Sequence, residues 1–132
     1  MWETKNTETT MKLVADKYPG INQFSGYGAD WVKINGETYH GSLLVSAQSV
    51  GNWRPAAFDD LRREDFSLVL AQQPELVLLA TGSRIRFPHP ALSRDLTDAR
   101  IGMEVMDVGA LCRTFNALVG EGRRAVALVL FE

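Results

Sequence analysis

Two short, unbroken runs of apolar residues, Leu76–Ala80 and Ala125–Phe131, most restrict what this chain can fold into. Neither run alternates with polar residues, so each predicts a β-strand that is covered on both faces. Both runs are far shorter than the roughly 20 residues that a helix needs to cross a bilayer, so we expect no membrane insertion. The sequence therefore predicts strands in the middle of a sheet, with other elements packed on that sheet.

The segments around these strands carry helical patterns. Residues 64–71 and 91–100 each predict a short helix, and Asp107 is a favourable N-cap for a third. The apolar residues of this third helix recur at helical spacing on one face: Val108, Leu111, Cys112, Phe115, Leu118 and Val119. Residues 103–106 predict another core strand. From residue 60 onward helices alternate with strands, which predicts an α/β domain with a mixed, partly parallel central sheet.

The amino-terminal half contains a predicted β-hairpin. Two strand-like segments, 31–34 and 37–45, flank Asn35 and Gly36, a residue pair that tolerates the positive φ angles of a type I′ turn. The first ten residues are polar, and they resemble neither a signal peptide nor a mitochondrial presequence. We expect residues 1–20 to form a polar tail and lead-in segment, and residues 21–132 to form a single domain.

The charge and the cysteine content limit the partners and the compartment. Fourteen basic and sixteen acidic residues give a net charge of -2, which provides no general attraction to nucleic acids or anionic lipids. The single cysteine cannot form an intrachain disulfide and fits a reducing compartment, so we expect a cytoplasmic protein. Unpaired strand edges in such a sheet also allow a homodimer.

Few residues suggest catalysis or metal binding. His40, His89 and Cys112 are too few and too scattered for a zinc site, and Cys112 falls on the apolar face of its helix, where packing explains it. A triad of Ser83, His89 and Asp95 can be drawn on paper, but the G-x-S-x-G elbow is absent. No nucleotide-binding fingerprint occurs. We predict no metal and no cofactor, and we lean against an enzyme.

A candidate ligand pocket follows the first buried strand, because open α/β sheets commonly hold ligands at the carboxyl ends of their strands. Its residues come from the turn after that strand and from the end of the third helix: Thr81, Gly82, Ser83, Arg84, Asn116 and Arg123. The alternative is a strand-ending turn with solvated arginines. For Arg123, the alternatives are helix capping or an internal pair with Glu121.

A candidate protein interface lies in a polar loop at Trp53 and Arg54. A tryptophan in such a loop can anchor a partner, because exposed aromatic side chains contribute much of the binding energy of interfaces. It can equally cover the hydrophobic core. The sequence leaves both interpretations open.

Several motifs resemble a family of small, uncharacterised α/β domains. Residues 78–82 resemble its glycine turn after a buried strand, and residues 114–124 resemble its closing helix motif. Residues 41–45 and Trp53 also match. The family is typified by a methanogen structural-genomics protein and is shared with mitochondrial complex I assembly factor 3 and an adipogenesis-associated protein. Ala80 departs from the usual Gly-Thr-Gly turn of the family.

The resemblance implies a three-layer β/β/α domain, with no established catalytic residues and no established cofactor. For the mitochondrial relative it implies a role in assembling the respiratory NADH dehydrogenase through protein contacts. We therefore predict a non-enzymatic protein-interaction or assembly module that binds an unknown protein partner. The alternative is a small-molecule or anion-binding domain, enzyme or not, that uses the turn at residues 81–84.

Overall fold

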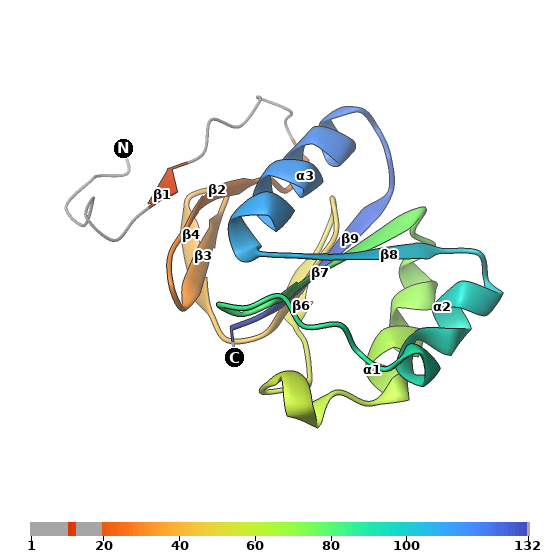
Figure 1. The fold of residues 1–132 in the computed structure, drawn as a ribbon. Coiled ribbons are helices and arrows are strands. Elements are labelled where there is room, and N and C mark those ends of the chain that lie inside the picture. The colour runs from red at the N-terminus through yellow and green to blue at the C-terminus, as the bar shows by residue number, and fades with distance from the viewer. Residues whose placement is uncertain (1–10, 13–19, 132) are drawn as a thin grey trace.

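The central five-stranded sheet of the domain is mixed, as the sequence predicts. The computed structural model describes residues 11–12 and 20–131 (Figure 1). The strand order is β6-β5-β9-β7-β8, with bounds β5 Leu43–Val45, β6 Val50–Asn52, β7 Leu76–Thr81, β8 Gly102–Met106 and β9 Ala125–Leu130. Strand β7 pairs in parallel with β8 and β9, whereas β5 pairs antiparallel with β6 and β9. This pattern confirms a partly parallel sheet.

The two apolar runs form the inner strands of this sheet. All six residues of β9 are buried, as are the last five of β7. The prediction that residues 103–106 form a buried core strand is wrong, because none of these residues is buried. Strand β8 lies at the sheet edge, and its residues alternate between exposed and half-buried. Only a central strand has neighbours on both sides, and the strand order is not encoded in the apolar pattern alone.

A smaller antiparallel sheet contains the predicted hairpin. Its order is β1-β2-β3-β4, with bounds β1 Met11–Lys12, β2 Phe24–Tyr27, β3 Trp31–Ile34 and β4 Glu37–His40. Asn35 and Gly36 have φ angles of 53° and 86°, which fits the predicted type I′ turn. The strand predicted over residues 37–45 is divided, because Gly41 adopts a φ of 83° and the chain then crosses into the five-stranded sheet as β5.

The predicted lead-in segment contributes one short strand. Strand β1 pairs with β2, where Met11 lies opposite Tyr27, so residues 11–12 belong to the smaller sheet rather than to a tail. Residues 1–10 and 13–19 of that predicted segment lie outside the described residues.

Helical segments complete the described part of the fold. Residues 63–72 form α1 (Arg63–Ser67) followed by the 3-10 helix η2 (Leu68–Gln72), and the predicted helix over 91–100 is η3 (Pro90–Ser93) followed by α2 (Arg94–Asp98). A further 3-10 turn, η1, spans Phe58–Asp60. Helix α3 spans Val108–Gly120, and the Asp107 carboxylate accepts a hydrogen bond from the Ala110 backbone N–H at 2.8 Å, as predicted for an N-cap. No helix in the described part of the chain has the length and hydrophobicity to cross a membrane.

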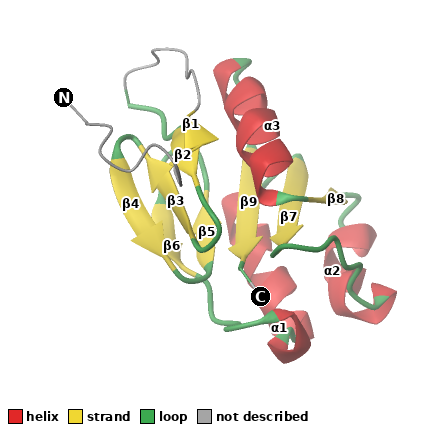
Figure 2. Cartoon of the chain, turned by 60° about the vertical axis from the view of Figure 1, so that its left-hand side comes forward, coloured by secondary structure: helices red, strands yellow, loops and turns green. Residues whose placement is uncertain are grey.

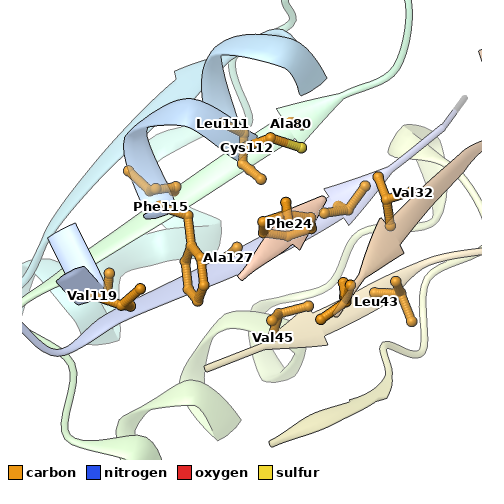
Figure 3. Packing of buried hydrophobic residues seen from close by; sticks show 14 residues of the cluster. Phe24, Val32, Leu43, Val45, Ala80, Leu111, Cys112, Phe115, Val119 and Ala127 are labelled. Carbon is orange, nitrogen blue, oxygen red and sulfur yellow. The ribbon is translucent and has the colours of Figure 1, made fainter. Parts of the chain in front are cut away.

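The elements form three layers (Figure 2). A core of buried side chains lies on each face of the five-stranded sheet. The smaller sheet and α3 cover one face, where Phe24 and Phe115 meet edge to face with their ring centroids 5.3 Å apart (Figure 3). Helices α1 and α2 cover the other face, around Phe66, Val69 and Leu96. The predicted three-layer β/β/α architecture is confirmed.

Candidate functional site

The turn after β7 is held by the side chain of Thr81. Thr81 is buried, its hydroxyl donates to the carbonyl oxygen of Arg84 at 2.7 Å, and it accepts from the backbone N–H of Arg86 at 2.9 Å. Gly82 adopts a φ of 87°, which other residues rarely tolerate. Ser83 and Arg84 are exposed. The Thr81 hydroxyl therefore organises the turn, which matches the strand-ending alternative.

The turn leads into a loop that presents two large apolar side chains to solvent. Ile85 is 50% exposed and Phe87 is 74% exposed. Arg86 lies between them and points the other way, since its guanidinium stacks 4.0 Å from the centre of the Phe58 ring and donates to Asp59 at 3.1 Å. This exposed pair was not predicted from the sequence. Apolar residues that alternate with arginines just before Pro88 and Pro90 are the signal that could have revealed it.

Asn116 and Arg123 do not join Thr81–Arg84 in one pocket. Asn116 is half-buried, and its side-chain amide accepts from the N–H of Phe24 and donates to the carbonyl of Phe24, both at 2.8 Å. Arg123 donates to Glu75, which precedes β7. It therefore lies at the other end of this strand, about 20 Å from the turn at Gly82. The six-residue pocket is thus a wrong grouping, because α3 ends near the beginning of β7.

The double hydrogen bond of Asn116 joins α3 to the edge of β2, and it gives a stability prediction. Asn116→Leu keeps the size of the side chain but leaves the N–H and C=O of Phe24 without these partners, so we expect the free energy of unfolding to fall by about 1–3 kcal/mol. Urea unfolding followed by circular dichroism measures the change. Asn116→Asp keeps the acceptor oxygen, so its free energy of unfolding should lie between those of the wild type and Asn116→Leu. Equal stability of Asn116→Leu and the wild type would show that water can replace the two hydrogen bonds between Asn116 and Phe24.

The Arg123 side chain forms an ion pair with Glu75 rather than with Glu121, which corrects the predicted internal arrangement. The Arg123 Nε to Glu75 Oε1 distance is 3.2 Å, and Arg124 Nη1 lies 3.4 Å from Oε2. The hydrogen bond from Arg123, followed by that from the Arg124 backbone N–H, lowers the pKa of Glu75. A cavity of about 130 Å³ lies beside this cluster and is lined by Ser46, Gln72, Val119 and both arginines.

Trp53 is part of the core, so its prediction as an interface residue is wrong. Only 3% of Trp53 is exposed, and its ring packs edge to face on Phe66 with the centroids 5.7 Å apart. The indole N–H donates to the carbonyl oxygen of Asp65 at 3.0 Å. The second interpretation, a tryptophan that covers the core, is the one the structure contains. Apolar contacts with α1 and the five-stranded sheet account for this burial.

Arg54 takes part in a local ion-pair network that the sequence analysis missed. Its guanidinium donates to both carboxylate oxygens of Asp65, at 2.8 and 2.6 Å, and to Asp60 at 3.2 Å. The side chain of Asp65 is 2% exposed. Burial alone raises the pKa of Asp65, but hydrogen bonds from Arg54 and from the Arg62 N–H outweigh this effect, so the pKa is lowered. The network fixes the loop between β6 and α1.

The residues considered for catalysis are occupied elsewhere. His89 accepts a hydrogen bond from the Ala91 N–H at the start of η3, and Asp95 pairs with Arg63 at 2.6 Å. Cys112 is fully buried, and burial raises the pKa of its thiol to about 12. Residues 11–12 and 20–131 contain no cluster of three or more metal-ligating side chains. The fold and site define a three-layer α/β domain whose polar candidates hold the structure together. The two most exposed large apolar residues of its described part, Ile85 and Phe87, lie on a loop.

The chain belongs to a family described as a protein of unknown function (DUF498/DUF598), which matches residues 24–130. It is 31% identical over 117 residues to the bovine NADH dehydrogenase [ubiquinone] 1 alpha subcomplex assembly factor 3, a match that covers 87% of this chain and 64% of the relative. The chain thus spans slightly less than two thirds of the length of that relative.

Two solved structures share the fold. A crystal structure of a protein from Bordetella parapertussis has a TM-score of 0.80 and 26% identity, and the match covers 88% of this chain and 100% of that one. A Bordetella pertussis protein described as a Mth938-like domain has a TM-score of 0.75 and 25% identity, with 92% of each chain covered. The family resemblance predicted from residues 78–82 and 114–124 is confirmed.

Proposed function

We propose that this chain is a non-enzymatic assembly module that binds a subunit of an NADH dehydrogenase complex while the complex is being built. The observation that carries the proposal is the similarity to assembly factor 3 over 87% of the chain. Because the chain spans only part of that relative, the binding role is assigned here to the domain alone. A shared fold by itself would not support a shared role, and the identity of 31% over 117 residues is the stronger argument.

The chemistry of the described residues supports binding rather than catalysis. The polar side chains that could have acted on a substrate are engaged in contacts within the domain, such as the bonds of Asn116 to Phe24 and of Arg123 to Glu75. The turn at Thr81–Arg84 remains the only part of the predicted ligand pocket that stays together, and Thr81 is used by the turn itself. We therefore place the small-molecule alternative second.

The same proposal includes a cytoplasmic location and protein partners. A single, buried cysteine fits a reducing compartment. The net charge of -2 favours neither nucleic acid nor anionic lipid as the main partner. The proposal also includes a homodimer, because β6 and β8 are the outer strands of the five-stranded sheet and their edges can pair with a second copy.

Deletion of the gene in the native cells tests the assembly role. We expect less fully assembled NADH dehydrogenase on native gels stained for NADH oxidation, and recovery when the wild-type gene is supplied on a plasmid. The succinate dehydrogenase of the same membranes serves as the control, because a general defect in respiration would lower both enzymes. An unchanged amount of assembled NADH dehydrogenase in the deletion strain would contradict the proposed function.

A further inference from the structure

The segment Arg84–Phe87 combines exposed apolar side chains with an exposed arginine, and we call it the Arg84–Phe87 loop. Phe87 is the most exposed large apolar residue in the described part of the chain, at 74%, and Ile85 follows at 50%. Arg86, which lies between them in the chain, is half-buried and packs on Phe58, whereas Ile85 and Phe87 both face solvent. Exposed aromatic residues that lack contacts within their own domain are typical anchors of protein interfaces.

Contacts within the domain hold this loop in place. Thr81 binds the backbone at both Arg84 and Arg86. Arg86 packs on Phe58 and forms an ion pair with Asp59. These contacts fix the backbone before a partner arrives, which reduces the conformational entropy lost on binding. The loop is therefore preorganised for binding a partner.

The charges around the loop indicate the chemistry of its partner. Arg84 is exposed and makes no ion pair within residues 11–12 and 20–131. The charge of Arg86 is balanced by Asp59 at 3.1 Å. Among the described residues, Arg84 thus has no acidic partner, and it directly precedes the exposed Ile85 in the chain. A matching surface provides an apolar pocket with an acidic residue at its rim.

We propose that the Arg84–Phe87 loop is the docking element of this domain, and that it inserts Ile85 and Phe87 into an apolar pocket of a partner protein whose rim carries an Asp or Glu facing Arg84. The inference rests on the proposed function, because it names the surface by which the assembly module would hold its subunit. Phe87 is the anchor, and Arg84 sets the orientation of the complex.

A second copy of the chain and a lipid surface fit these observations less well. Two cavities of the domain, of about 130 and 360 Å³, have no Asp or Glu among their lining residues, so neither offers an acidic rim to Arg84 of another copy. Stable attachment to a membrane needs more than one weak signal, such as a cluster of cations beside the apolar residues. Within the described residues only Arg84 of this loop lacks an acidic partner, and the side chain of Asp59, which pairs with Arg86, is 87% exposed. A protein pocket is therefore the occupant we assign.

Site-specific photo-crosslinking in the native cells tests the docking element. Benzoylphenylalanine at position 87 should crosslink to one protein, and the same group at Thr38, an exposed position on the smaller sheet, should not. The crosslinked protein, identified by mass spectrometry and purified, then serves as the binding probe. Phe87→Ala should weaken its binding about 30-fold, the effect of a typical interface anchor.

Matched variants separate the pocket from its acidic rim. Leu68→Ser removes another exposed apolar residue and should leave the affinity for the probe unchanged. Arg84→Glu should weaken binding more than Arg84→Lys does, and added salt should weaken wild-type binding more than Arg84→Gln binding. All these positions are exposed, so each variant is expected to fold, and its melting temperature checks this.

Three outcomes would overturn the docking proposal. They are crosslinking from position 38 but not 87, wild-type affinity in Phe87→Ala, and Phe87-dependent flotation with phosphatidylserine vesicles in place of a protein crosslink. Failure of the proposed function is distinguishable from these. A crosslinked protein with the predicted pocket that is no part of NADH dehydrogenase would contradict the assembly role and support the docking element. An assembly defect in the deletion strain without a crosslink at position 87 would support the assembly role and contradict the docking element.

Discussion

Replacing Trp53 with alanine is expected to lower the free energy of unfolding by about 3–5 kcal/mol, the range for large aromatic residues in a core. Trp53 is 3% exposed and packs between Phe66 and the five-stranded sheet, so the substitution leaves a cavity. It also removes the indole partner of the Asp65 carbonyl. Urea unfolding monitored by far-UV circular dichroism measures the loss of stability. Tryptophan fluorescence is less suitable, because the substitution itself removes the fluorescence of Trp53.

Trp53→Phe is the matched control for this prediction. It keeps an aromatic ring and loses the 3.0 Å hydrogen bond to Asp65, so we expect a clearly smaller loss of stability. Wild-type stability in Trp53→Ala would contradict the placement of this residue in the core. Loss of partner binding in Trp53→Ala would report unfolding rather than a lost contact, so Phe87, not Trp53, is the residue to vary in binding experiments.

Replacing Asp65 with alanine is expected to cost about 3 kcal/mol, because the buried carboxylate accepts charged hydrogen bonds that no other group can replace. Its oxygens accept from the Arg54 guanidinium and, at 2.8 Å, from the Arg62 backbone N–H at the start of α1. Thermal and urea unfolding measure the change. Asp65→Asn keeps the shape and one acceptor oxygen and should fall between Asp65→Ala and the wild type. Equal stability of all three proteins would show that the network does not stabilise the fold.

The same carboxylate predicts a pH dependence. The pKa of Asp65 is lowered from its ordinary value of 3.8, so the carboxylate stabilises the folded state fully above that value. The contribution is lost as the pH falls through the lowered pKa of the folded state. Below about pH 4 the stability difference between the wild type and Asp65→Asn should therefore shrink. A difference that stays constant down to pH 2 would contradict the ionised state of Asp65.

Local sequence patterns predicted most of the secondary structure. The apolar runs at β7 and β9, the Asn35-Gly36 turn and the Asp107 cap each depend on residues close together in the chain. The breaks were harder to predict. Gly41 divides the strand predicted over 37–45, and the edge position of β8 follows from the order of strands, which no single segment contains.

The candidate site was less predictable than the fold, because a polar side chain in the sequence does not reveal its partner. Asn116 binds Phe24, which is 92 positions away, and Arg123 binds Glu75, which is 48 positions away. Both residues were predicted to line a ligand pocket, because the sequence alone does not show that Phe24 and Glu75 are their partners. Phe87 presents the opposite problem: the arginines and prolines around it indicate a loop, but they do not by themselves determine whether the core covers the ring or leaves it 74% exposed.

By itself, the sequence determined most of the helices and strands from residue 31 onward, the α/β class and the family, because periodicity, caps, turns and motifs act over a few residues. Only the tertiary structure decided which residues are buried and which charges are paired. It placed Trp53 in the core, Asp65 beside Arg54, and Ile85 and Phe87 in solvent. Burial and pairing depend on contacts between segments far apart in the chain, and a contact of that kind is fixed only when the layers pack.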